Sequence, residues 1–490
     1  MKKLLYSIVV SFLCIPLRAQ VIDDFQKYMM EQNEAINKYI RDEEEAIRRY
    51  NDSINMAFGK YLAENWPEYK LEKHDQSIKN PVPLTYFDPQ RQPSSPVKLL
   101  PNKEFKIPQI PIPPIKKEEK LPIIPLDNFK TSLFYGATIS YPKLSLPFLK
   151  LKGVTEKDVA DYWNQLSALS YPIWTTRIEQ LREELMLNDW ALYLLVKNSF
   201  HVYFPQGNSN EEVIYTIFTL NQLGYRARIG RDNKELMPLL AVNCNINGSM
   251  YFYDLDNESV KYWVMDPENK ELDCINSCRM EYGNADRLFD MGIKYSLQLP
   301  VSLVTKSYVA GDEMYELSYN QNLQGIYSTY PCIDYPIYAQ SALDDVLVES
   351  INETLCPVLQ GLSQEEAVNK LLRFVQLAFE YKTDNEQFGV LERRFFAEET
   401  MSAQYSDCED RAILFAQLVR HLLDMPIVLV HYLNRHLATA IHFDNPDTFG
   451  DYLMIDDKKY LICDPTYINA NLGRSMPQLN DVPIIIYKLK

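Results

Sequence analysis

Residues 67–127 contain thirteen of the 29 prolines of this 490-residue chain and no glycine. Proline fixes φ and has no N–H group, so it is excluded from helix interiors and from the middle of a sheet. We therefore expect this Pro-rich segment to be extended, either as a stiff spacer or as a strap laid over the globular part. The globular part then begins near Asp127.

The N-terminus has the pattern of a secretory signal. Lys2 and Lys3 precede an apolar run over residues 4–17, which is too short to span a membrane, and Ala19 is a small residue suited to cleavage. We therefore expect residues 1–19 to be removed and the mature chain to be exported, to the periplasm or the extracellular space, without stable membrane insertion.

Residues 20–66 place apolar side chains at helical intervals and predict a long amphipathic helix that Pro67 ends. Such a helix packs on its own protein or pairs with a second copy of itself. The whole chain has a formal charge of −16, which becomes −19 once the three basic residues of the signal are removed. An acidic chain of this kind argues against nucleic acid and anionic membranes as partners.

The sequence SDCEDR, from Ser406 to Arg411, places Cys408 near the start of a predicted helix. Ser406 and Glu409 have the spacing of a capping box, and the apolar run 412–423 follows them. Free N–H groups and the helix dipole stabilise a thiolate at such a position, so we expect a lowered pKa for Cys408. The alternative is that the cysteine is a small buried apolar residue.

Four segments with strand character follow this helix. The third and fourth flank Asp456-Asp457, which predicts a tight hairpin. His436 opens one strand and Asp464 follows another, so Cys408, His436 and Asp464 supply the nucleophile, the base and the residue that orients the base in thiol catalysis. The four segments are residues 425–433, 436–443, 451–455 and 458–463.

Two other uses of these residues are open. His442 lies on the same strand face as His436 and is the alternative base. Cys408, His436, His442 and Cys463 could together bind zinc, although they lack the compact spacing of a zinc motif. We therefore expect no metal and no cofactor.

These residues resemble the transglutaminase-like superfamily, in which a helix-borne Cys precedes a strand-borne His and a strand-end Asp. The resemblance covers about residues 365–473, through SDCEDRA, HLATAIHF and YLICDPT. Ser406 stands where a glycine is usual, and Ala438 stands where an aromatic residue is frequent. The resemblance implies an α+β, papain/transglutaminase-like domain with a Cys-bearing helix on an antiparallel sheet. It also implies acyl transfer through a thioester, with Cys408, His436 and Asp464 as the triad.

The region 128–290 is interpreted as a degenerate copy of this domain. Aligning Asn208 with Cys408 matches the apolar helices 213–223 and 413–423. In the same alignment Asp266 falls within a few positions of Asp464. Asn208 is not a thiol nucleophile, and the sequence has no histidine between Asn208 and Asp266, so this copy would be inactive.

The remaining organisation follows from these two copies. Residues 291–335 are rich in β-branched and aromatic residues and predict bridging strands, and residues 336–490 form the catalytic domain. Seven cysteines remain after removal of the signal, and an odd number in an exported chain fits one free thiol.

The sequence thus predicts an exported cysteine enzyme that acts on amides of a protein or peptide substrate. With water as the second nucleophile it would be a protease or amidase, and with a lysine amine a cross-linking acyltransferase. We favour hydrolysis, because cross-linking needs an additional acceptor site. The alternative is a non-catalytic secreted scaffold whose two related domains bind protein or peptide.

Overall fold

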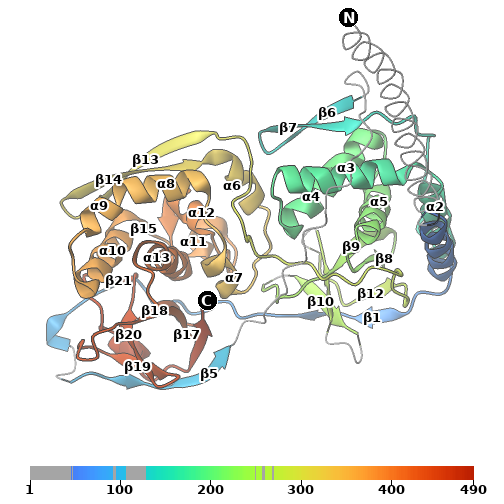
Figure 1. Ribbon diagram of the computed structural model, residues 1–490. Helices are drawn as coiled ribbons and strands as arrows, with labels where there is room; N and C mark the ends of the chain where they lie inside the picture. The colour runs from blue at the N-terminus through green and yellow to red at the C-terminus, as the bar shows by residue number, and fades with distance from the viewer. Residues whose placement is uncertain are drawn as a thin grey trace, which may run out of the picture.

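The computed structural model describes residues 46, 48–91, 95–105, 129–248, 250–255, 260–266 and 270–489. The chain forms two lobes that lie side by side, each with helices packed against a seven-stranded, mainly antiparallel sheet (Figure 1). This mixture of helices and antiparallel sheets confirms the α+β part of the predicted fold. The predicted signal, residues 1–19, lies outside the described residues.

The N-terminal lobe contains four helices and a seven-stranded sheet, with a separate two-stranded hairpin above them (Figure 1). The helices are α2 (Glu156–Ser167), α3 (Tyr171–Glu184), α4 (Asp189–Tyr203) and α5 (Ser209–Gln222). The sheet contains, in spatial order, β1 (Glu68–Lys70), β12 (Cys274–Ser277), β8 (Ala227–Asp232), β9 (Glu235–Ala241), β11 (Lys261–Val264), β10 (Tyr251–Asp254) and β2 (Glu72–Lys73). The hairpin is β6 (Phe129–Phe134) and β7 (Ala137–Pro142).

The C-terminal lobe is built around one buried helix, α13 (Cys408–Leu423), which lies at its centre (Figure 1). Its other helices are α7 (Tyr335–Gln340), α8 (Asp345–Thr354), α9 (Cys356–Leu359), α10 (Gln364–Ala378), α11 (Asp384–Phe388) and α12 (Ala397–Ser402). The sheet contains, in spatial order, β4 (Lys98–Leu99), β19 (Tyr452–Ile455), β20 (Lys458–Cys463), β18 (His436–His442), β17 (Ile427–Tyr432), β22 (Ile484–Lys488) and β5 (Pro101–Phe105). Two short parallel pairs lie outside this sheet: β15 (Glu380–Tyr381) with β16 (Tyr405–Ser406), and β3 (Thr85–Tyr86) with β21 (Tyr467–Ile468).

The two sheets have the same strand order. In the N-terminal lobe, β12-β8-β9-β11-β10 follows helix α5, and in the C-terminal lobe β22-β17-β18-β20-β19 follows helix α13 in the same spatial arrangement. A segment from residues 68–105 adds the edge strands of both sheets, β1 and β2 in one and β4 and β5 in the other.

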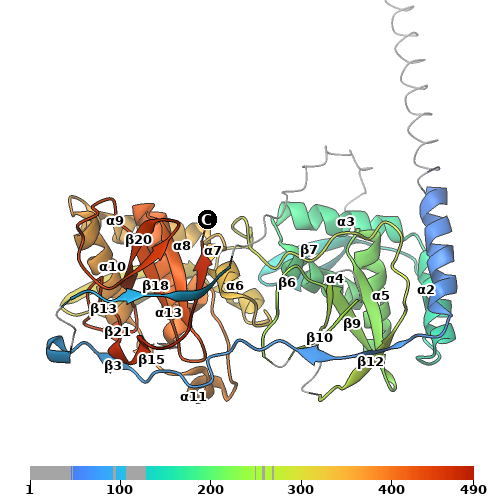
Figure 2. The ribbon, with the colours of Figure 1, turned by 90° about the horizontal axis from the view of Figure 1, so that it is seen from below.

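The described part of the Pro-rich segment is therefore a strap. Figure 2 shows it running along both lobes, in blue. Its strands occupy only sheet edges, which is where a chain with missing N–H donors can pair. By contributing edge strands to both sheets, the strap joins the lobes and also covers edges that would otherwise be open to pairing with another chain.

The predicted N-terminal helix is described only in its last part, where residues 48–62 are helical. Phe58 and Leu62 are buried, and the ring centroid of Phe58 lies 4.9 Å from that of Trp163 in α2. This part of the helix therefore packs on its own protein.

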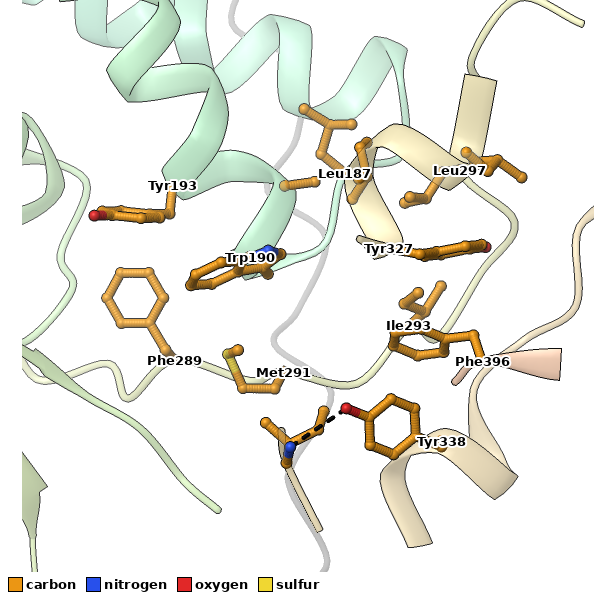
Figure 3. Close-up of a cluster of buried hydrophobic side chains, with 14 of the residues drawn as sticks. Leu187, Trp190, Tyr193, Phe289, Met291, Ile293, Leu297, Tyr327, Tyr338 and Phe396 are labelled. Atoms are coloured by element: carbon orange, nitrogen blue, oxygen red, sulfur yellow. Dashed lines mark hydrogen bonds between the residues drawn. The ribbon is translucent and has the colours of Figure 1, made fainter. Parts of the chain in front are cut away.

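The two lobes share a single apolar core, and Figure 3 shows the side chains at their junction. Trp190 of α4 donates a hydrogen bond from Nε1 to Thr329 at 3.0 Å, while the rings of Tyr327 and Phe396 lie 4.7 Å apart. Met291, from the connection between the lobes, is fully buried among them. A continuous core of this kind fixes the lobes against one another.

Within residues 291–335 the strand prediction is wrong in part. Leu303–Ala310 (β13) and Glu313–Asn320 (β14) form a hairpin, but the next residues form helix α6 (Gln321–Tyr327). The Asn320 side chain accepts a hydrogen bond from the Asn322 N–H and caps this helix. The aromatic content of the segment had favoured strands, whereas the cap and the buried spacing of Leu323, Ile326 and Tyr327 specify a helix.

The four strands predicted after α13 are present, as β17 to β20. The predicted turn at Asp456-Asp457 is a two-residue hairpin with φ of 48° and 60°. These left-handed angles match the twist of the paired strands, and Asp tolerates them better than most residues.

Two glycines fix the loop that follows Asp464. Gly473 has φ of +71°, and a Cβ added to it would lie 2.6 Å from Cα of Gly450. Its N–H donates to the Ile462 carbonyl at 2.6 Å and its carbonyl accepts from the Asp451 N–H at 2.9 Å. Backbones this close leave no room for a side chain.

We expect Gly473→Ala to lower the free energy of unfolding by at least about 2 kcal/mol, from the left-handed backbone and the backbone clash together. Gly361→Ala is the matched control, because Gly361 has φ of +80° but nothing within 4 Å of an added Cβ. It should cost about 1 kcal/mol. Chemical denaturation of both variants measures the difference, and equal losses would contradict the close approach.

Candidate functional site

Cys408 is the first residue of helix α13. The residue that caps this helix is Asp407, whose N–H donates to the Asp410 carboxylate at 3.3 Å. The predicted Ser406–Glu409 capping pair is therefore wrong. Ser406 is instead part of strand β16, and its hydroxyl accepts a hydrogen bond from Arg411 at 3.1 Å.

His436 and Asp464 form a buried pair. His436 is the first residue of β18 and Asp464 follows β20, and their Nε2 and Oδ2 atoms lie 2.9 Å apart. The second carboxylate oxygen of Asp464 accepts from the Thr466 N–H at 2.9 Å, and the Gln376 side chain donates to the Asp464 carbonyl at 3.1 Å. Nδ1 of His436 is buried and has no hydrogen-bond partner.

The thiol of Cys408 lies beside the strand that carries His436. The backbone N–H of Leu437, the next residue after His436, is directed at the sulfur. The thiol itself donates to Oε2 of Glu409 at 2.9 Å. The Cys408 sulfur therefore lies against the backbone of the strand that carries His436, with no hydrogen bond between thiol and imidazole, and the side chains of Cys408, His436 and Asp464 are all buried.

The expected lowering of the Cys408 pKa is wrong for this arrangement. Burial, followed by the carboxyl groups of Glu409 and Asp407, raises the pKa of the thiol well above its usual value. A helix start contributes the equivalent of about half a positive charge. Burial, together with the carboxyl groups of Glu409 and Asp407, outweighs that contribution, which favours the protonated thiol in this conformation.

Carboxyl groups surround the start of α13. Asp384, Asp407 and Glu409 each offer an oxygen within 4.8 Å of the others, and all three side chains are buried. Burial raises the pKa of Asp384 to about 7 and that of Glu409 to about 8, and neighbouring carboxyl groups add to both. The sequence SDCEDR includes Asp407 and Glu409, so these two acids could be expected near Cys408. No local sequence pattern predicts that Asp384, which belongs to helix α11, lies beside them.

The strap packs on the rim of this site. The N–H groups of Asn80 and Val82 donate to the carbonyls of Asn434 and Arg435, each at 3.0 Å, in the turn just before His436. The Val82 carbonyl accepts from the hydroxyl of Tyr381 at 3.5 Å, and Tyr381 is an electrostatic neighbour of Cys408. Since Cys408 is 1% exposed, the site is closed in this conformation.

The alternative sites predicted from the sequence are not assembled. His442 is at the far end of β18, where Nδ1 contacts the Lys459 carbonyl at 2.9 Å. Among the described residues, Asp384, Asp407 and Glu409 are the one group of His, Cys, Asp or Glu side chains close enough to share an ion, so the zinc set is not brought together. The seven cysteines of the described chain are all free.

The corresponding positions of the N-terminal lobe carry other residues. Asn208 caps α5 as Asp407 caps α13, so Ser209 occupies the helix position of Cys408. Strand β9 begins at Glu235, where β18 begins at His436. Asp266 follows β11 and accepts from the Tyr193 hydroxyl at 2.9 Å. This lobe has neither a thiol nor an imidazole at these positions.

Neither a scan against protein-family models nor a search of the curated proteins finds a match for this chain. In the described part of the chain, helices are too short or too polar for one to cross a membrane.

We expect Asp464→Ala to lower the free energy of unfolding by about 2–4 kcal/mol, because it leaves buried His436 without its partner. Glu184→Ala is the matched control. It removes the Arg177–Glu184 pair, which has the short distance of 2.7 Å but a glutamate side chain that is 55% exposed. An exposed pair contributes at most about 1 kcal/mol. Similar losses in the two variants, measured by urea denaturation, would contradict a structural role for the buried pair.

Proposed function

We propose that this chain is an exported cysteine enzyme of transglutaminase-like type that attacks peptide or side-chain amides. The observation that carries the proposal is the buried His436–Asp464 pair, 2.9 Å apart, next to a cysteine at a helix start. Export rests on the sequence of residues 1–19 alone. The shared strand order of the two lobes supports the interpretation of residues 128–290 as a degenerate copy of the C-terminal domain.

In the proposed mechanism each imidazole nitrogen has its own role. Nε2 of His436 is held by Asp464, which fixes the ring and leaves the unpartnered Nδ1 to accept the thiol proton. Cys408 then attacks the amide carbon and forms a tetrahedral intermediate. Free N–H groups at the start of α13 stabilise its oxyanion.

The leaving amine or ammonia takes the proton back from Nδ1, and a thioester on Cys408 remains. Water or an amine then attacks the thioester and regenerates the thiol, with His436 again transferring the proton. We favour water as this second nucleophile, because transfer to an amine requires a further docking site.

Turnover requires a rearrangement of the closed site. The thiol must rotate from Glu409 toward His436, and substrate must reach a sulfur that is 1% exposed. The strap contacts of Asn80 and Val82 lie next to His436, so movement of this short segment is a direct route to opening.

The second candidate is a non-catalytic scaffold that binds protein or peptide. The observation that favours it is the state of the Cys408 thiol. This thiol is buried, has a raised pKa and donates its hydrogen bond to Glu409 rather than to His436. The two candidates differ in whether Cys408 forms a covalent acyl intermediate.

The test is incubation of the mature protein with a peptide library and hydroxylamine, followed by mass spectrometry for cleaved, deamidated and amine-modified products. We expect products with the wild type, none with Cys408→Ala, and a rate about 10²–10⁴-fold lower with His436→Ala, which removes the proton acceptor. Cys356→Ser is the matched control, because Cys356 is an exposed free thiol outside the site.

Intact mass measurement should also show an acyl adduct that maps to Cys408. Products that persist in Cys408→Ala would contradict the assignment of the nucleophile. Peptide binding by the wild type without any product or adduct would support the scaffold instead.

A further inference from the structure

The carboxyl groups at the start of α13 have the arrangement of an ion site. Asp384 comes from the first turn of α11, while Asp407 and Glu409 flank Cys408. One oxygen from each lies within 4.8 Å of the others. Oxygens bound on opposite sides of one Ca²⁺ ion are separated by about 5 Å, so all three fit a single coordination sphere.

Asp384 and Asp407 each have one carboxylate oxygen without a hydrogen-bond partner, while the side chains of Asp407 and Glu409 interact with each other. Oδ1 of Asp384 and Oδ1 of Asp407 are buried without a hydrogen bond, in side chains of residues that are only 2% and 5% exposed. The other oxygen of Asp384 accepts from the Arg393 backbone N–H, and Oε2 of Glu409 accepts from the Cys408 thiol. Buried carboxylate oxygens without a donor are costly unless a cation or a proton is present.

Three guanidinium groups act electrostatically on these acids, Arg393 and Arg394 on Asp384 and Arg411 on Asp407, but each makes its hydrogen bonds elsewhere. Arg393 pairs with Glu399 at 3.1 Å, and Arg394 pairs with Glu392 at 2.9 Å. Within the described residues, no lysine, arginine or histidine forms an ion pair with Asp384, and the same holds for Asp407 and Glu409. Three acidic groups therefore converge in the interior with no positive side chain paired to them.

We propose that Asp384, Asp407 and Glu409 bind one hard divalent cation, with Ca²⁺ as the first choice. Carboxylate oxygens are the ligands that hard cations prefer, and Ca²⁺ accepts irregular geometry and bidentate carboxylates more readily than Mg²⁺ does. Water or backbone carbonyls would complete the shell. The inference does not depend on catalysis by Cys408, because it concerns binding alone.

The test is calorimetric titration of the EGTA-treated full chain with Ca²⁺, Mg²⁺ and Mn²⁺ in turn. We expect one bound ion per chain with a dissociation constant on the order of 10⁻⁶–10⁻³ M and a rise in melting temperature with ion concentration. Tb³⁺ provides a second readout, since Tyr381 neighbours Asp407 and Glu409 and should sensitise its emission.

Asp384→Asn and Glu409→Gln should each weaken binding by at least about 10-fold. Both substitutions keep the side-chain shape and remove repulsion, so the ion-free variants should melt no lower than the wild type. Glu398→Gln is the matched control, because Glu398 is a buried carboxyl group that instead accepts from the Asp344 N–H at 2.8 Å.

The titrations of the variants distinguish a specific site from binding to the acidic surface. Binding that Asp384→Asn and Glu409→Gln weaken and Glu398→Gln leaves unchanged supports the site, and the tightest ion of the three identifies the cation. An absence of binding with all three ions up to about 10 mM, beyond the weak end of protein Ca²⁺ sites, would overturn the proposal. Binding that survives both site substitutions would also overturn it and would assign the ions to the acidic surface.

Discussion

Buried Arg411 holds the parts of the candidate site together. Its guanidinium donates to the Phe379 carbonyl at 2.6 Å, to the Gln376 carbonyl at 3.5 Å and to Ser406, and so ties the start of α13 to the end of α10. From α10, the Gln376 side chain donates to the carbonyls of Asp464, Tyr467 and Ala470. Helix α10 is thus the common support of the cysteine and of the aspartate, which are far apart in the sequence. Neither could shift alone without breaking buried hydrogen bonds.

The same region combines groups with opposed electrostatic requirements. A nucleophilic thiol benefits from nearby positive charge, yet Cys408 has Asp407 and Glu409 on either side and Asp384 close to both. Burial raises the pKa of all three acids and of the thiol, so each of these groups binds its proton more tightly in this closed state. Whatever neutralises the carboxyl groups also changes the field at the sulfur. The acid cluster and the cysteine are therefore parts of a single electrostatic unit.

Local sequence signals were sufficient to predict the helix and strands around the site. They were insufficient to predict which side chains from other segments surround it. The strands after α13 and the Asp456-Asp457 turn followed from alternation and turn chemistry, because such signals lie within a few residues. The helix start was misplaced by one residue, since Ser406 and Asp407 are equally good caps and only the pairing of β16 with β15 decides between them. Proline content did predict an extended strap or spacer, but the sheet edges that the strap covers and the buried acid from α11 are contacts between distant segments, for which a single sequence carries no local signal.

The strap makes the two lobes, which share a strand order, depend on one another unequally. Both sheets receive two edge strands from the same segment, so the second lobe is completed by residues that precede the first. Separate folding of the C-terminal lobe would leave β19 and β22 as open edges, with unpaired N–H and C=O groups. The strap also supplies Asn80 and Val82 to the turn before His436. One segment therefore completes both sheets and closes the candidate site, which couples the stability of the two lobes to access at Cys408.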